Sequence, residues 1–460
     1  MRHFNCNNEK EKPELNLMTM GALPPEILID ILSRLPINSI CCMRCVSKAL
    51  LKMVDDLSSA ALDMRRRFLT TCSTPRLVVL KESSYDKYDM LYPVTYDGHY
   101  LLTKSKDAIV SYFGSKRRFY SSAFVFCNLF GFTGLNPKHG RSSKHGRSCL
   151  LVNPFKGEVV MLPSASDVQV PANCLCTVDW YGMGFDNITN SFKIVRVSTN
   201  KKDYLAAEVL VLGKSSWREL PMVPPCFPTY KSVYAHGYMH WLVDGDYTSS
   251  ARILSFNFKK EEFYLTPLPT PLGKDPDLWK CLHLINFRGS MALVYASSPQ
   301  DEYVKMRGYR QCVEVWGLKN YDNKEWELKY KIDTKQDLSI HWEPTSFSKC
   351  GEWDHGIYLN QESSLNNCIF FVHLGDGSME CVLLKGQLIV HSCTGSMISL
   401  SNCGDLVEAE DEQGITEFPM PKKTWRNLIN VVEISGRDLC YLKTQTESAS
   451  ISWDWKDIYV

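Results

Sequence analysis

The chain of 460 residues is 44% hydrophobic and 22% charged, as is typical of globular proteins, and its length allows one small and one large domain. Its formal net charge of +1 provides no overall field that would attract nucleic acid or an anionic membrane. We therefore expect neither as a partner, and we expect partners to be chosen by local surfaces.

The chain contains 18 cysteines, which would indicate a disulfide framework only in a small secreted protein. The N-terminal residues lack the charged and then apolar pattern of a secretory signal. We therefore predict reduced thiols and a location in the cytoplasm, the nucleus or both. The longest apolar run, residues 123–132, is interrupted by Asn128 and is too short to span a bilayer.

Residues 1–18 are polar and are predicted to be disordered. The pattern at residues 23–36 then predicts a helix of about three turns. Pro24 and Pro25 suit the start of this helix, and Pro36 ends it. Its apolar side chains recur at helical spacing, at Ile27, Leu28, Ile31, Leu32 and Leu35.

Residues 38–54 have the pattern of two further short helices, which gives a helical unit of about 40 residues. A unit of this size is at the edge of independent stability, and part of its apolar stripe should remain outside its own core. That part could bind a second protein or pack against the rest of this chain. The pattern alone favours neither alternative.

The same region resembles the F-box in nearly unbroken order, through LPPEILIDILSRLP at 23–36, SI at 39–40 and RCVSK at 44–48. The sequence departs from the family pattern at Leu50, where a Trp is usual, and at residues 41–43, where Leu and Arg are common. The resemblance implies a docking unit for a Skp-type adaptor and, through it, a cullin. The adaptor-binding residues that it implies are Leu23, Pro24, Ile27, Leu28, Ile31, Leu35, Pro36 and Val46.

Beyond residue 75 the chain changes to short strand patterns that are punctuated by Gly, Pro and Asn. Hairpin modules begin at residues 151, 209, 253 and 313. Their spacing of roughly 45 to 60 residues suits four-stranded propeller blades with uneven loops. Residues 232–234 and 239–243 are predicted to be inner strands between the modules.

These modules resemble the F-box-associated, kelch-like domain that follows the F-box in a large plant family. The matching motifs include NP at 153–154, GMGFD at 182–186, FKIVR at 192–196 and HWL at 240–242. The resemblance implies an α+β multidomain protein in which a small three-helix F-box precedes a large all-β, kelch-like β-propeller. The predicted organisation is a disordered tail at 1–18, the F-box at 19–66, a linker at 67–75 and the propeller at 76–460.

Motifs that suggest chemistry have simpler structural explanations. Gly182 and Gly184 lack the third glycine of a nucleotide fingerprint, and we predict a hairpin turn there. His240 lies in an apolar strand and is expected in the core. Cys42 and Cys45 have a metal-like spacing, but no second pair follows. We therefore predict no catalytic residues, no cofactor and no metal.

A basic loop at residues 138–148 contains KHGRS twice. Lysine and arginine pair well with phosphate and carboxylate groups, so the loop could bind a phosphorylated or acidic partner. A duplicated solvated loop is the commoner explanation.

The leading hypothesis is a non-catalytic substrate-recognition subunit of an SCF-type (Skp–cullin–F-box) ubiquitin ligase. The helical unit would dock the adaptor, the propeller would hold an unknown target protein, and the rate effect would come from tethering. Two alternatives stay open. One is an adaptor-bound scaffold or inhibitor outside ubiquitination, and the other is a glycan-binding or enzymatic propeller.

Overall fold

The computed structural model describes residues 24, 27–28, 31, 45–55, 75–81, 90–96, 101–102, 109–110, 120–135, 147–154, 158–163, 179–199, 205–243, 252–272, 278–297, 312–321, 323–333, 347–362, 367–384, 388–394, 398 and 400. The chain separates into two compact units, residues 1–54 and 55–460, which we describe one at a time. The predicted tail at 1–18 and the helix count of the F-box lie outside the described residues, and the predicted domain boundaries stay predictions.

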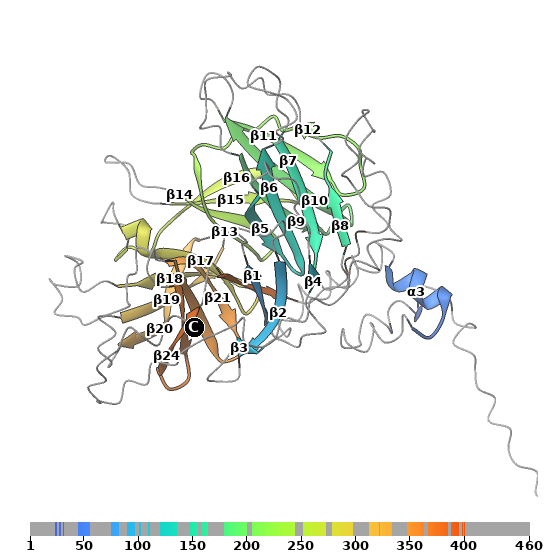
Figure 1. Ribbon diagram of the computed structural model, residues 1–460. Helices are drawn as coiled ribbons and strands as arrows, with labels where there is room; N and C mark the ends of the chain where they lie inside the picture. Colours follow the sequence, from blue (N-terminus) through green and yellow to red (C-terminus); the bar gives the residue numbers. More distant parts are fainter. Residues whose placement is uncertain are drawn as a thin grey trace, which may run out of the picture. The chain divides into compact units, whose positions relative to one another are not determined.

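Five of the antiparallel sheets in the second unit each use four consecutive strands (Figure 1). The first contains β5 (Tyr120–Phe126), β6 (Leu129–Leu135), β7 (Arg147–Asn153) and β8 (Glu158–Met161). The second contains β9 (Asp179–Asp186), β10 (Ser191–Thr199), β11 (Leu205–Val211) and β12 (Arg218–Glu219). The third contains β13 (Pro228–Ala235), β14 (Tyr238–Val243), β15 (Arg252–Asn257) and β16 (Glu262–Pro267).

The fourth and fifth sheets repeat this order. A 3₁₀-helix, η3 (Leu278–Cys281), leads into β17 (Leu282–Phe287), which is followed by β18 (Ser290–Ala296), β19 (Cys312–Asn320) and β20 (Glu325–Asp333). The fifth sheet contains β21 (Phe347–Trp353), β22 (Gly356–Gln361), β23 (Asn367–His373) and β24 (Met379–Leu384). In each sheet the order in space follows the order in sequence, as in a propeller blade.

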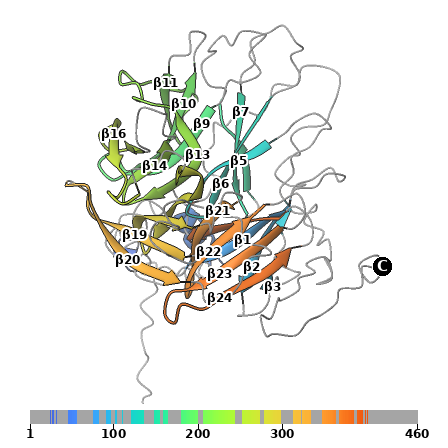
Figure 2. The ribbon, with the colours of Figure 1, turned by 90° about the vertical axis from the view of Figure 1, so that its left-hand side faces the viewer.

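The sixth sheet joins the two ends of the domain. Its inner strand is β25 (Leu388–Thr394), and its other strands are β1 (Pro75–Lys81), β2 (Met90–Tyr96), β3 (Leu101–Leu102) and β4 (Ile109–Val110). The register runs from Pro75 opposite Thr394 to Lys81 opposite Leu388. Figure 2 shows β1, β2 and β3 beside strands from the C-terminal part of the domain.

The inner strands β5, β9, β13, β17, β21 and β25 each contact the next, and β25 contacts β5. The described residues of this unit therefore form a closed six-bladed propeller, which confirms the predicted all-β propeller and supplies its blade number. The kelch-like character of the repeats stays a prediction. No helix among the described residues is long and apolar enough to cross a membrane.

Two predictions about the blades are wrong. Residues 239–243 form part of β14, the second strand of its blade, because a tight turn at His236 and Gly237 pairs them with β13. Gly182 and Gly184 lie inside strand β9, where we predicted a turn, and the turn comes at residues 187–190.

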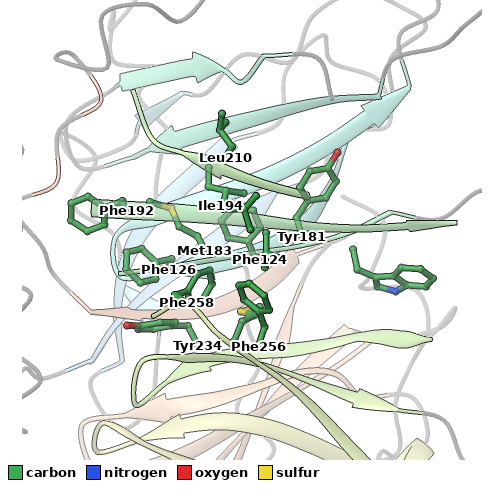
Figure 3. Close-up of a cluster of buried hydrophobic side chains, with 14 of the residues drawn as sticks. Phe124, Phe126, Tyr181, Met183, Phe192, Ile194, Leu210, Tyr234, Phe256 and Phe258 are labelled. Carbon is green, nitrogen blue, oxygen red and sulfur yellow. The ribbon is translucent and has the colours of Figure 1, made fainter. Parts of the chain in front are cut away.

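The glycines of β9 make room for side chains of the next blade. A Cβ atom at Gly182 would lie 2.4 Å from Cγ of Met239, and one at Gly184 would lie 2.2 Å from the ring of Phe258. Met239 and Phe258 belong to an apolar cluster that fills the space between the first three blades (Figure 3). The prediction that His240 is buried in the core is confirmed, since it is 1% exposed.

The chain beyond β25 is held by polar side chains of the first blade. Nδ2 of Asn153 donates to the carbonyl oxygen of Ile398 at 2.9 Å, and Oδ1 of Asn153 accepts from Nδ2 of Asn128 at 3.1 Å. A carboxylate oxygen of Glu158 accepts the N–H of Leu400 at 2.7 Å. These bonds tie the closing strand to the blade that follows it around the ring.

We expect Gly184→Ala to lower the free energy of unfolding by about 2 kcal/mol, because the new methyl group overlaps the ring of Phe258 and that ring is fully buried. Urea denaturation followed by tryptophan fluorescence measures the change. Gly375→Ala is the matched control, since a Cβ there meets nothing within 4 Å. Equal losses in the two variants would contradict the packing argument.

We expect Asn153→Ala to lower the free energy of unfolding by about 3 kcal/mol, because it removes two buried hydrogen bonds, one to the Ile398 carbonyl and one from the Asn128 amide. The same denaturation measurement applies. The exposed Asn323→Ala is the control and should change stability by less than about 0.5 kcal/mol. A similar small change in Asn153→Ala would show that these bonds do not hold the closing strand.

Candidate functional site

The first helical turn of the small unit begins at Pro24. Its carbonyl oxygen accepts the N–H groups of Ile27 and Leu28, both at 3.1 Å. Ile27 is 50% exposed and Ile31 is 40% exposed, whereas Leu28 is 6% exposed. Residues four apart in sequence lie on one face of a helix. Ile27 and Ile31 therefore form an exposed apolar pair, whereas Leu28 is buried in the core of the unit.

Helix α3 (Lys48–Asp55) follows in the same unit and has a well-formed N-cap. Oγ of Ser47 accepts the N–H of Leu50 at 3.1 Å, which satisfies an N–H group that the helix itself leaves unpaired. Leu50 is buried and Val46 is exposed. Leu50, which stands where the F-box family usually has Trp, is therefore part of the core of this unit.

The described part of the unit places five of the predicted adaptor-binding residues. Pro24, Ile27, Ile31 and Val46 are exposed, and Leu28 is buried. Leu23, Leu35 and Pro36 lie outside the described residues. The apolar stripe is thus divided between a core and an exposed part, and the docking role of its members stays a prediction.

In the propeller, two lysines near the starts of inner strands stand out because irregular pairing surrounds them. The register of β13 against β14 shifts between Pro228 and Ser232, and that of β21 against β22 shifts between Phe347 and Lys349. Lys231 lies within the first irregular stretch and Lys349 at the end of the second. Such bulges change the direction of side chains and are frequent beside functional sites.

The two lysines have different surroundings. Nζ of Lys231 donates to the carbonyl oxygens of Lys280 and Leu282, at 2.6 and 2.9 Å, and burial lowers its pKa to about 8. Burial also lowers the pKa of Lys349, while the charge of Glu362 opposes that shift. The side chain of Lys349 makes no hydrogen bond or ion pair with any described residue, although both lysines are partly exposed to solvent.

Two buried histidines lie near these lysines. Burial lowers the pKa of His283, and the charges of Lys231 and Lys349 lower it further. Burial and the charge of Lys349 lower the pKa of His391 to about 3. Nε2 of each ring has no hydrogen-bond partner among the described residues. The centre of the propeller therefore combines partly exposed cations with neutral imidazoles.

Two buried cations in the described part of the propeller, Arg196 and Lys193, are paired and have a structural role. Arg196 donates to Asp179 at 3.1 Å and to Glu208 at 2.6 Å within one blade. Lys193 bridges Asp186 and Glu261 at 2.8 Å each, which links two blades. The described residues contain no group of three or more potential metal ligands, and their ten cysteines are free.

The sequence pattern does not single out Lys231 or Lys349. Both lie in short, half-apolar strands, where a lysine usually points to solvent. Their setting depends on which strands are innermost and on the two bulges, and neither is visible in a local pattern. The basic loop at residues 138–148 lies mostly outside the described residues.

The matches with known families define the class of protein, in which a β-propeller follows a small F-box domain. Residues 115–400 match the family described as the F-box associated beta propeller domain, and residues 21–60 match the F-box domain. The first match spans more than half of the chain. The chain therefore belongs to the family of F-box proteins that carry an F-box associated β-propeller.

Relatives from Arabidopsis thaliana agree with this assignment. Putative F-box protein At1g30920 is 25% identical over 317 residues, which are 66% of this chain and 72% of the relative. F-box protein At2g40925 is 26% identical over 322 residues, which are 66% of this chain and 71% of the relative. Both similarities include most of the propeller.

One solved structure that resembles the chain is the β-propeller domain of the Trilobed protease from Pyrococcus furiosus. It has a TM-score of 0.32 and 9% identity, and the match covers 62% of this chain and 98% of the other. Similarity at this level carries no functional argument, and the propeller assignment rests on the six sheets themselves.

The pKa values of the buried histidines predict acid sensitivity. The folded-state pKa of His391, about 3, lies below the value of roughly 6.5 for an unfolded chain. The contribution of neutral His391 to the free energy of unfolding is therefore complete above roughly pH 6.5. It is lost as the pH falls below that value, by up to about 1.4 kcal/mol per pH unit. We expect His391→Phe to reduce the slope of unfolding free energy against pH between 6.5 and 5.

Urea denaturation at several pH values measures this slope. The exposed His355→Gln is the control variant. If His391→Phe and the unmodified protein lose stability equally on acidification, protonation of His391 is not a source of the acid sensitivity.

Proposed function

We propose that this chain is the substrate-recognition subunit of an SCF-type ubiquitin ligase. In this proposal the F-box binds a Skp-type adaptor and, through it, a cullin, and the propeller binds a target protein. The observation that carries the proposal is the exposed pair Ile27 and Ile31, which lies within the part of the chain that matches the F-box. An apolar pair that lies outside the core of a small unit is suited to burial against a helix or groove of a partner protein.

In this role the chain contributes position and no chemistry of its own. Binding the adaptor and the target on one molecule raises the effective concentration of the target beside the ubiquitin-transferring subunits. The family assignment supports this role, because the Arabidopsis relatives are described as F-box proteins. The proposal places the protein in the cytoplasm, the nucleus or both, where free thiols such as those of the described cysteines persist.

We expect the double variant Ile27→Asp, Ile31→Asp to lose at least tenfold in affinity for a purified Skp-type adaptor, because two carboxylates would be buried in an apolar interface. Pull-down and calorimetric titration measure the affinity. Ile188→Asp is the matched control, since Ile188 is 63% exposed and belongs to the propeller. Adaptor binding that survives the double variant would refute the proposed docking surface.

A second measurement separates a ligase subunit from an adaptor-bound scaffold or inhibitor. Proteins that accumulate when the chain is removed should also accumulate in cells that carry only the Ile27→Asp, Ile31→Asp form. Accumulation in the first case alone would show that the propeller acts without the adaptor.

A further inference from the structure

The chain between the second and third blades exposes a group of large apolar side chains. The exposed large apolar residues in the described part of the propeller unit are Met161, Ile188, Met222, Val223, Phe227, Tyr230 and Leu328. Four of these seven lie within residues 222–230. Single exposed apolar side chains are ordinary, whereas a group of them marks an interaction surface.

We name residues 221–230 the apolar ridge. They connect β12, the outermost strand of one blade, to β13, the innermost strand of the next. The sequence of the apolar ridge, PMVPPCFPTY, contains no charged residue. Its own residues can therefore offer a ligand apolar contacts but no ion pair.

The apolar ridge lies along one end of the second blade. The strand registers place Trp180 opposite Val197, and Val197 opposite Ala207. The carbonyl oxygen of Ala207 accepts the N–H of Leu220, which directly precedes the apolar ridge, at 2.8 Å. The ring of Phe227 then returns to the start of this row, since its centroid lies 6.3 Å from that of Trp180. The apolar ridge thus runs from the outer to the inner strand of the blade.

Prolines hold the apolar ridge in shape. They stand at positions 221, 224, 225 and 228, and each restricts its own backbone and that of the preceding residue. Pro224 and Pro228 are buried, whereas the exposure of Met222 is 44%, that of Val223 is 50% and that of Phe227 is 49%. A surface that is already ordered loses little conformational entropy when a ligand binds.

Trp180 supplies a polar group beside this apolar surface. Its side chain is 8% exposed, and its indole Nε1 is buried without a hydrogen-bond partner among the described residues. Buried indole N–H groups usually have an acceptor, because an unpaired one has lost its bond to water without a replacement. Trp180 is therefore a donor that lacks an acceptor, and it lies next to the exposed ring of Phe227.

Two other tryptophans of the propeller show which acceptor suits such a donor. The indole N–H of Trp217 donates to the carbonyl oxygen of Pro163, and that of Trp326 donates to the carbonyl oxygen of Pro267, each at 2.9 Å. In both pairs the acceptor is the backbone of a proline that ends a strand segment of the preceding blade. An indole N–H of this fold is thus suited to a proline carbonyl.

The conformation of the ligand follows from the need for a free carbonyl oxygen. In a helix or a sheet the backbone carbonyl groups are already paired, whereas the polyproline II helix makes no internal hydrogen bonds and leaves them available. Proline-rich segments in this conformation bind surfaces lined by aromatic side chains. The lack of charge on the apolar ridge favours a segment that is itself uncharged.

From this arrangement, and building on the proposed function, we propose that the apolar ridge and Trp180 receive the target protein through an uncharged, proline-rich segment in the polyproline II conformation. The apolar side chains of the segment would pack on Met222, Val223 and Phe227. One backbone carbonyl oxygen would accept the indole N–H of Trp180, which becomes accessible when the ring of Phe227 changes its rotamer.

The test uses the full chain bound to a purified Skp-type adaptor and four pools of labelled 12-residue synthetic peptides. The first pool combines proline with Leu and Val and has no charged residue. The second replaces proline by alanine, the third replaces Leu and Val by Ser, and the fourth adds Glu residues to the first. Fluorescence anisotropy reports the binding of each pool.

We expect the first pool to bind at least tenfold more tightly than each of the other three. The pair Met222→Ser, Phe227→Ser should abolish this preference, and both altered side chains are exposed, so folding should be retained. Trp180→Phe removes the indole N–H and keeps an aromatic ring, and it should weaken binding of the first pool by about tenfold. Urea denaturation checks that each variant is folded.

Matched control variants carry the same changes elsewhere in the propeller. Trp326→Phe removes an indole N–H that already has an acceptor, and the pair Ile188→Ser, Leu328→Ser removes two other exposed apolar side chains. Both should bind the first pool as the unmodified chain does. Equal binding of the four pools, unchanged binding in Met222→Ser, Phe227→Ser, or tighter binding of the Glu pool would overturn the proposal.

A second copy of this chain is the rival occupant of the apolar ridge. Sedimentation of the unmodified complex and of the Met222→Ser, Phe227→Ser form measures self-association. Equal sedimentation of the two as single copies is expected, and dimers that only the unmodified complex forms would overturn the choice of a target segment.

The outcome is separable from that of the proposed function. Every variant is assayed for adaptor capture in parallel, and the altered residues all lie in the propeller. If the peptide preference fails while adaptor capture persists, the assignment of the target surface falls and the docking role of the F-box stands. If adaptor capture fails in the unmodified protein, the ligase role falls.

Discussion

Closure of the ring is the constraint on which the rest of the propeller depends. Strand β25 pairs with β1 along seven residue pairs, and without that pairing the first and last blades would have open edges. The entropic cost of bringing such distant segments together grows slowly with loop length, so one good strand pairing can offset it. Polar bonds from Asn153 and Glu158 then hold the chain beyond β25 against the first blade. A closed ring fixes the inner strands relative to one another. A surface to which several blades contribute keeps its shape only if these strands are held in place.

Charged groups in this ring fall into two kinds. Arg196, Lys193 and their carboxylate partners are buried and paired, and removing one partner from such a group leaves an uncompensated charge in the interior. Lys349 is different, because it has lost hydration without gaining a described hydrogen-bonding partner. The charge of Glu362 opposes the effect of this burial on the pKa of Lys349.

The sequence was a good guide where the signal is local. Hairpins such as β11–β12 and β15–β16 follow from alternating strands around glycine or lysine-rich turns, and the helical stripe predicted that apolar side chains would be divided between core and surface. Prediction from the sequence failed where a residue packs against residues that are distant along the chain. Gly182 and Gly184 are small because Met239 and Phe258 of another blade occupy the space, and no nearby residue shows this. The blade number was not predictable either, since one blade takes its strands from both ends of the domain.

The two units share one physical feature, which is that each leaves apolar side chains exposed to water directly beside buried residues. Ile27 is exposed beside the buried Leu28, and Phe227 is exposed beside the buried Pro228. Uncovered apolar groups favour aggregation, so their retention on rigid elements is understandable if a partner covers them. Adaptor and target would then each contribute the missing half of an interface that this chain cannot complete alone. In the proposed role the chain would join two proteins, and that role needs neither a cofactor nor a reactive side chain.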